Sequence, residues 1–303
     1  MDRRSVVKSA AVAGAGAIMM AGGGEVVGVR PAQSAALSAA PQRGSFFESP
    51  DGASLFYNDW GSGKPIVFSH AWGLNADIWE YQLTELSDQG FRCVAYDRRG
   101  HGRSSDPGRG YDYDTLSDDL AALIERLDLT EVTLVGFSMG SGEVVRYLSR
   151  HGAGRITRVV LVSAVAPKPD SLRFPGVVAA LKQDRPAFFA GGVPFFIGES
   201  TVSPAMSQWI LTQFLRASPK AIIECMRTIS ASDLRDDLAA IKLPTLVIHG
   251  SNDQVNPLDG TAKLTAATIP GAELRVYPDA PHGLVITHKD RLTKDLLAFI
   301  GNA

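Results

Sequence analysis

A serine flanked by two glycines lies where a strand pattern changes to a helix pattern. The run VTLVGF predicts a strand that ends at Phe137, and the residues after Ser138 predict a helix. This G-x-S-x-G turn presents a nucleophilic serine in a strained backbone conformation, and side chains at Gly136 or Gly140 would clash with neighbouring elements. The amino end of the new helix favours developing negative charge. We therefore expect Ser138 to be a nucleophile.

A serine hydroxyl needs a base before it can attack efficiently. In proteins with this turn, the acid and then the base follow the serine in the chain. Asp253 follows the predicted strand PTLVIHG, and His282 follows the predicted strand AELRVYP. We expect His282 to take the proton of Ser138, and Asp253 to orient His282 and stabilise its cation, while the serine attacks a carbonyl.

Other histidines and one further strand-end aspartate compete for these roles. His70 ends a strand but precedes the serine, and we expect it to shape the loop that binds the oxyanion. His249 ends a strand and is expected to be a packed core residue. Asp97 ends a strand but opens the turn DRRGHGRS, so we expect a structural role. Three histidines occupy a glycine-rich turn, a helix end and a helical pattern: His101, His151 and His288.

A tetrahedral intermediate needs hydrogen-bond donors for its oxyanion. One expected donor is the backbone N–H of Met139, the residue after the nucleophile. The loop after the predicted strand PIVFSH reads His70-Ala71-Trp72-Gly73. We assign the second donor to the backbone N–H of Trp72.

Eight strand-like runs alternate with helix-like segments and must position these residues. The middle runs are continuous Val/Ile/Leu blocks, which indicates strands buried on both faces of a mostly parallel sheet. Alternating strands and helices predict a doubly wound α/β fold, whose sites lie at the carboxyl ends of its strands. The expected strands are 45–49, 53–61, 65–70, 92–97, 132–137, 158–164, 244–250 and 272–278.

Residues 167–237 interrupt this alternation because they contain no buried strand pattern. They are rich in aromatic residues and proline, and we expect a helical cap inserted after the sixth strand, over the active edge of the sheet. The alternative is that this segment packs within the main core. An apolar pocket for a small acyl group is expected from four residues, each also a candidate core residue: Phe195, Phe196, Trp209 and Val255.

The first residues have the layout of an export signal. Arg3 and Arg4 are followed by an Ala/Gly-rich apolar run, and then by small residues that offer cleavage sites between Ser34 and Ala40. We expect residues 1–40 to be a cleaved twin-arginine signal, and 41–303 to be one catalytic domain that is periplasmic or extracellular and not membrane-bound. The alternative is an ordinary basic N-terminus.

Composition excludes several partner classes. The net charge is −2 and there is no basic stripe, so no nucleic acid is expected as partner. Cys93 and Cys225 are far apart in the chain and are expected to be free buried thiols. No His/Cys cluster indicates a metal site, and we expect no cofactor.

Several segments together resemble the α/β-hydrolase family: SHAW, DRRGHGRS, GFSMGSGEVVRYLSRHG, LPTLVIHGSNDQVNP and YPDAPHGLVITH. They are more similar to its cofactor-free haloperoxidase, aryl esterase and perhydrolase branch. The resemblance implies Ser138, Asp253 and His282 as triad and Trp72 and Met139 as oxyanion-hole residues. It also implies an ester substrate, water or hydrogen peroxide as acyl acceptor, peracid that oxidises halide, no haem or metal, and a homo-oligomer.

Two residues depart from the family pattern. Ala71 stands where glycine is usual, which would cost about 1 kcal/mol or more if that residue needs a positive φ. Ser141 also replaces a usual glycine, and we expect little effect from it.

The sequence leaves three functions open. The first is a serine esterase with perhydrolase activity as a second activity. The second is a carbon–carbon bond or lactone hydrolase with the same triad. The third is a non-catalytic ligand-binding protein on the same scaffold, against which the intact set of Ser138, Asp253 and His282 argues.

Overall fold

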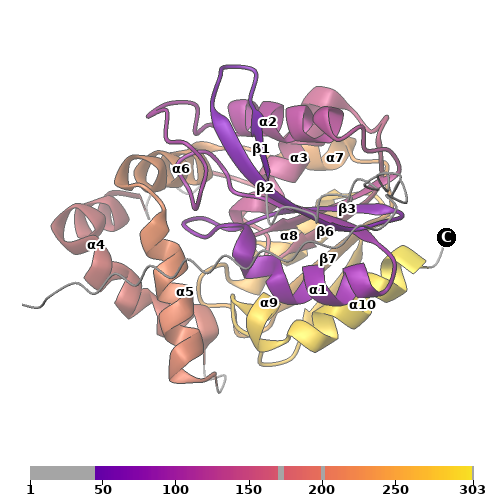
Figure 1. Ribbon diagram of the computed structural model, residues 1–303. Coiled ribbons are helices and arrows are strands. Elements are labelled where there is room, and N and C mark those ends of the chain that lie inside the picture. The colour runs from indigo at the N-terminus through magenta and orange to yellow at the C-terminus, as the bar shows by residue number, and fades with distance from the viewer. Residues whose placement is uncertain (1–44, 170–173, 199–201, 302–303) are drawn as a thin grey trace, which may run out of the picture. The chain divides into compact units, whose positions relative to one another are not determined.

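The computed structural model describes residues 45–169, 174–198 and 202–301 (Figure 1). The expected export signal, residues 1–40, lies outside these ranges. Within them, no helix is both long enough and apolar enough to cross a membrane.

The described residues form one eight-stranded sheet, in the order β1-β2-β4-β3-β5-β6-β7-β8. The first two strands pair in antiparallel fashion, and β2 pairs antiparallel with β4, whereas all later pairings are parallel. This confirms the expected mostly parallel sheet. The strands are β1 (Ser45–Glu48), β2 (Ser54–Gly61), β3 (Pro65–Ser69), β4 (Arg92–Tyr96), β5 (Val132–Phe137), β6 (Ile156–Val162), β7 (Thr245–Gly250) and β8 (Glu273–Tyr277).

Helices cover both faces of the sheet, so the central strands are buried on both sides (Figure 1). In β3, Val67 packs into one apolar cluster, whereas Ile66 and Phe68 pack into the other. This division explains the continuous apolar runs of the sequence.

The helices lie on the two faces of the sheet. One face carries α2 (Tyr113–Arg126) and α3 (Met139–His151), and the other carries α1 (Glu80–Asp88), α9 (Leu284–Thr287) and α10 (Lys289–Gly301). The α8 helix (Ala262–Thr268) connects β7 to β8, and two short 3₁₀ helices, η1 (Ala76–Trp79) and η2 (Leu258–Gly260), precede α1 and α8.

Between β6 and β7, where the sequence predicts a cap, the described residues form four helices. They are α4 (Phe174–Ile197), α5 (Pro204–Arg216), α6 (Pro219–Ala231) and α7 (Arg235–Ala240). The first three lie at one end of the sheet (Figure 1), whereas α7 packs against α3 of the main body.

Local sequence explains where the cap helices begin and bend. The α4 helix breaks at Asp184 (φ −157°, ψ 88°), whose carboxylate accepts the N–H of Ala187 at 2.9 Å. Ser203 and Ser218 cap α5 and α6, each followed by proline at the first helical position. The cap then buries Phe189, Phe196 and Phe214 in the apolar cluster of the nearer sheet face.

Candidate active site

Ser138 lies at the sharp turn between β5 and α3. Its backbone has φ 53° and ψ −115°, which is a strained conformation for a residue with a side chain. A Cβ at Gly136 would lie 2.5 Å from the carbonyl oxygen of Gly140, and a Cβ at Gly140 would lie 2.5 Å from that of Ser69. Glycine at both positions is therefore a steric requirement of this turn, as the sequence indicates.

The structure brings Ser138, Asp253 and His282 together from the loops after β5, β7 and β8. His282 Nε2 lies 3.0 Å from Ser138 Oγ, and His282 Nδ1 lies 2.7 Å from Asp253 Oδ2. Because the carboxylate can only accept, Nδ1–H donates to it and Nε2 is free to accept the serine O–H. All three residues are buried. This arrangement can remove a proton from the hydroxyl as the serine attacks an electrophile.

The Asp253 carboxylate is held by several donors. Its Oδ1 accepts the backbone N–H groups of Val255 at 2.9 Å and Asn256 at 2.7 Å. Burial would raise the pKa of Asp253, but His282, with smaller contributions from His249 and the Asn256 N–H, holds it below its ordinary value. The acid is thus kept ionised beside the imidazole.

His249 also contacts the acid, which sequence reasoning missed. Its Nε2 donates to the carbonyl of Asn256 at 2.7 Å and lies 3.3 Å from Asp253 Oδ2. Burial lowers the pKa of His249, so the ring is neutral. The sequence signal for this contact is a strand-end histidine four residues before the acid.

The loop after β3 carries the expected second oxyanion donor. Ala71 is absent from the described non-glycine residues with positive φ, whereas Gly73 has φ 74°. The strain considered for Ala71 therefore does not arise. His70 Nδ1–H donates to the Ala71 carbonyl at 2.8 Å, and His70 Nε2 accepts the N–H of Arg98 at 3.0 Å. His70 thus shapes this loop.

The other expected donor, Met139, is the first residue of α3. The first N–H groups of a helix have no acceptor inside the helix and remain available to a ligand. The hydroxyl of Ser141, from which little effect is expected, makes two contacts beside the turn. It donates to the Ser138 carbonyl at 2.6 Å and accepts the N–H of Val165 at 3.2 Å. Ser141 therefore ties the turn to the chain that follows β6.

A cavity of about 500 Å³ opens on Ser138 and His282. Phe195, Phe196 and Val255 line it, as expected for the pocket. Trp209 was expected there as well, but it is not among the described lining residues, because its half-buried side chain packs into the apolar cluster instead. Further lining residues that the sequence did not single out come from the cap and the sheet edge, and include Trp72, Val165, Phe188, Phe189, Phe214, Met226 and Ile229.

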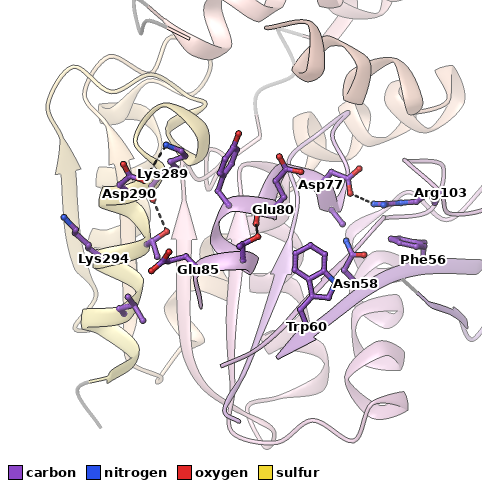
Figure 2. Close-up of a pocket in the computed structure, with 15 residues that line it drawn as sticks. Phe56, Asn58, Trp60, Asp77, Glu80, Glu85, Arg103, Lys289, Asp290 and Lys294 are labelled. Atoms are coloured by element: carbon purple, nitrogen blue, oxygen red, sulfur yellow. Dashed lines mark hydrogen bonds and ion pairs between the residues drawn. The ribbon is translucent and has the colours of Figure 1, made fainter. Parts of the chain in front are cut away.

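A larger groove of about 990 Å³ lies elsewhere, along α1, α10 and β2 (Figure 2). Its lining is rich in charged side chains, among them Glu80, Glu85, Lys289 and Lys294, and Ser138 and His282 do not line it. The groove therefore belongs to a different surface from the candidate active site.

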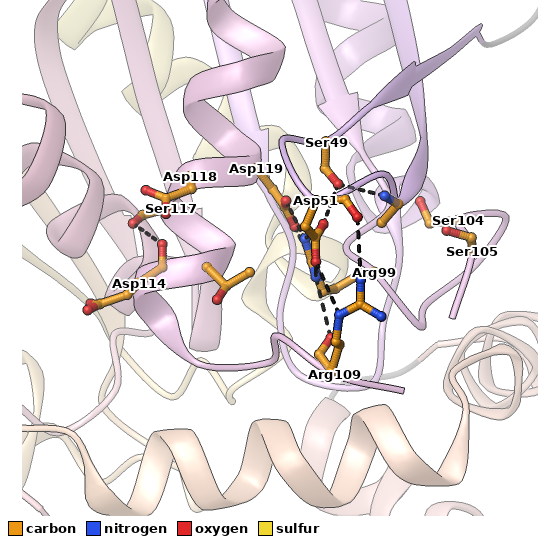
Figure 3. Close-up of polar contacts among 12 residues, drawn as sticks. Ser49, Asp51, Arg99, Ser104, Ser105, Arg109, Asp114, Ser117, Asp118 and Asp119 are labelled. Atoms are coloured by element: carbon orange, nitrogen blue, oxygen red, sulfur yellow. Dashed lines mark hydrogen bonds and ion pairs between the residues drawn. The ribbon is translucent and has the colours of Figure 1, made fainter. Parts of the chain in front are cut away.

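The turn DRRGHGRS has structural contacts, as expected. Asp97 accepts the backbone N–H of Ala76 at 2.8 Å and both the backbone N–H and the Nε of Arg103 at 2.7 Å. Arg99 lies between two carboxylates (Figure 3), with Nη2 2.6 Å from Asp119 and 2.9 Å from Asp51. These pairs fix the turn against the sheet and α2.

Neither a disulfide nor a metal cluster is found in the described ranges. Cys93 and Cys225 are buried and free, and burial raises the pKa of each thiol to about 12. No described group of three His, Cys, Asp or Glu residues is arranged to hold a metal ion.

Comparison with known proteins places these features in a family. The family model described as alpha/beta hydrolase fold matches residues 64–196 and 204–289. A non-heme haloperoxidase of Rhodococcus erythropolis is 40% identical over 84% of this chain and 98% of its own. A bifunctional esterase/perhydrolase of Acinetobacter calcoaceticus is 35% identical over 84% of this chain and 99% of its own. The structure of an esterase from Exiguobacterium antarcticum, 32% identical, superposes with a TM-score of 0.83, covering 86% of this chain and all of that one.

Proposed function

The chain belongs to the α/β-hydrolase family, and on that premise we propose that it is a serine hydrolase of carboxylic esters that works through an acyl-serine intermediate, with perhydrolysis as a second activity. The observation that carries the proposal is the hydrogen-bonded series from Ser138 through His282 to Asp253, with contacts of 3.0 and 2.7 Å, at the wall of an apolar cavity. Relatives whose names include esterase, perhydrolase and haloperoxidase support the same chemistry.

The first half-reaction transfers the acyl group to the protein. His282 Nε2 accepts the proton of Ser138 as Oγ attacks the ester carbonyl, and Asp253 stabilises the imidazolium that results. The oxyanion accepts hydrogen bonds from the backbone N–H groups of Trp72 and Met139. When the intermediate collapses, His282 donates its proton to the departing alcohol.

The second half-reaction removes the acyl group. His282 accepts a proton from water or hydrogen peroxide, whose oxygen attacks the acyl carbonyl, and the proton then returns to Ser138 Oγ. Water yields a carboxylic acid, and peroxide yields a peracid that oxidises halide in solution. Both acyl transfers use Ser138, His282 and Asp253 of this chain, and no step is assigned to a metal or haem.

Replacement of the nucleophile tests the assignment. Ser138→Ala is expected to abolish hydrolysis of p-nitrophenyl esters and labelling by a fluorophosphonate, because both need Oγ. Persistence of either activity would refute the role of Ser138. Turnover of lactones or diketones without turnover of any p-nitrophenyl ester would instead favour a lactone or carbon–carbon bond hydrolase.

An acyl-chain profile with and without hydrogen peroxide then defines the substrate. The cavity of about 500 Å³ is lined mainly by aromatic and aliphatic side chains, so we expect uncharged, apolar acyl groups to be preferred. Peroxide is expected to divert the acyl group to peracid, measured by oxidation of bromide. A preference for charged acids would contradict this pocket assignment.

Two further properties are proposed on sequence and resemblance alone. Arg3 and Arg4, followed by an Ala/Gly-rich run, support export through the twin-arginine route and residence outside the cytoplasmic membrane. Replacement of both arginines by lysine is expected to retain the protein inside the cell. The family resemblance supports a homo-oligomer, which light scattering of the purified protein would test.

A further inference from the structure

The side chain of Trp72 reaches from the oxyanion loop into the cap. Its indole Nε1–H donates to the backbone carbonyl of Ile222 in α6 at 2.8 Å. Its ring contacts two α4 residues, Phe188 and Phe189, with centroid distances of 6.3 and 5.6 Å. One residue of the loop is therefore bound to two cap helices.

Cap helix α5 contacts Gly73, the residue that follows Trp72 in the loop. Gly73 is buried with φ 74°, and a Cβ there would lie 2.9 Å from Cδ1 of Phe214 in α5. The Phe214 ring stacks on Phe189 at a centroid distance of 4.8 Å, which joins α5 to α4. The three helices α4, α5 and α6 therefore converge on Trp72 and Gly73.

The main domain holds the same peptide from the other side. His70 Nδ1–H donates to the Ala71 carbonyl, and that carbonyl belongs to the same planar unit as the N–H of Trp72. A planar trans peptide fixes the direction of its N–H once its C=O is fixed. The Trp72 N–H is thus positioned by His70 on one side and by the indole contact with α6 on the other.

We propose that the Trp72 indole is a positioning group through which cap helix α6 sets the place of the Trp72 backbone N–H in the oxyanion hole. This inference rests on the proposed function, in which that N–H is one of the two oxyanion donors. The hydrogen bond to Ile222 aligns the donor in the capped protein, so displacement of α6 weakens transition-state binding more than substrate binding.

Tryptophan N–H groups are not all paired in this protein, which makes the contact of Trp72 distinctive. Trp79 is fully buried, and its Nε1 has no hydrogen-bond partner among the described residues. The same chemical change at Trp79 therefore removes no hydrogen bond and provides a matched control.

The test replaces Trp72 by its benzothiophene isostere, in which sulfur takes the place of the indole N–H and the ring shape is kept. We expect kcat for p-nitrophenyl esters to fall by about 10-fold, with KM changed by less than about 2-fold. The affinity for a boronic acid that forms a tetrahedral adduct on Ser138 should fall in parallel with kcat. The isostere at Trp79 should leave all three quantities unchanged.

Unchanged kcat and unchanged boronate affinity in the Trp72 isostere would overturn the inference, and so would a fall in melting temperature alone. Trp72→Phe extends the measurement to a variant made without unnatural residues and should lower kcat at least as much. Ser138→Ala separates the two proposals. If that variant is inactive while the Trp72 isostere is fully active, only the positioning role fails. If Ser138→Ala is active, the proposed function itself fails.

Discussion

His249 Nε2 lies 3.3 Å from Oδ2 of Asp253, the same oxygen that accepts the hydrogen bond of His282. One carboxylate oxygen thus faces two imidazoles. The neutral ring of His249 adds no net charge, and its Nε2–H donates to the carbonyl of Asn256, whose own N–H donates to Oδ1 of Asp253.

Replacement of His249 by phenylalanine removes this N–H and keeps a ring of similar size. We expect kcat to fall by about 5- to 10-fold because Asp253 orients His282 less well. The free energy of unfolding should fall by about 1–3 kcal/mol because the Asn256 carbonyl loses its 2.7 Å hydrogen bond and keeps only the 3.3 Å contact with Thr261 Oγ1. Ester kinetics and chemical denaturation measure both effects. His288→Phe, outside the site, is the matched control, and equal kcat in the two variants would contradict the positioning role.

Asp97 and Asp253 both follow strands, β4 and β7, but are expected to respond differently to substitution. Asp97→Ala removes the acceptor for Ala76 and Arg103 and should lower the free energy of unfolding by about 2–4 kcal/mol, with little change in the kcat of the folded protein. Asp253→Asn should lower kcat by about 10⁴-fold with a smaller loss of stability. Urea denaturation and ester kinetics on both variants test the assignment, which would be reversed if Asp97→Ala were the catalytically dead one.

Ser141→Ala removes the hydroxyl that joins Ser138 to Val165. The buried N–H of Val165 then lacks a partner, so we expect a loss of about 1–3 kcal/mol of unfolding free energy. Ser117→Ala is a control, because the Ser117 hydroxyl makes a similar bond to the Asp114 carbonyl at 2.8 Å without a second contact. Equal losses in the two variants would show that the link to Val165 contributes nothing.

The buried imidazole of His101 makes stability depend on pH. Burial, together with the nearby Arg98 guanidinium, lowers the pKa of His101 to about 3, whereas the unfolded chain titrates at the ordinary value of 6.5. The contribution of His101 is therefore fully present above pH 6.5 and is lost as pH falls toward 3, by about 1.4 kcal/mol per pH unit.

His101→Asn places an amide N–H near the position of Nδ1, which contacts the Arg99 carbonyl at 2.9 Å, but cannot titrate. The difference in unfolding free energy between the native protein and this variant should shift by about 2 kcal/mol between pH 6.5 and pH 5, to the disadvantage of the native protein. Denaturant titrations at a series of pH values measure it. Parallel pH profiles would rule out a buried neutral His101.

The sequence predicts the sheet and the cluster of Ser138, Asp253 and His282 because strand ends in a parallel sheet meet at one edge. Each of these residues is marked by the strand before it, so its position follows from the strand alone. The cap offers no such reference. Without a sheet, the sequence could not show that Phe196 lines the cavity whereas Trp209, which packs against the same apolar cluster, is not among its described lining residues.

The sequence also could not predict the side-chain hydrogen bonds that join separate segments around the site. The bonds from Ser141 to Val165 and from Trp72 to Ile222 link segments 24 and 150 residues apart. Such pairs depend on the exact rotation of each helix, which hydrophobic periodicity leaves undefined. The sequence also does not show which residue of the loop after β3 has a positive φ. In the structure that residue is Gly73, two positions after Ala71.

The cap occupies one crossover between β6 and β7, which are adjacent parallel strands. Any such pair needs a long connection, because the chain leaves β6 at its carboxyl end and must return to the amino end of β7. The cap lies within this connection, so it can be exchanged without changing the pairing of the two strands. A cap grafted from a relative would keep the strand register. It would also have to present a backbone carbonyl to the Trp72 indole, as Ile222 does, and a side chain that packs against Gly73 without a clash, as Phe214 does. Specificity and rate would therefore be inherited together in such chimaeras.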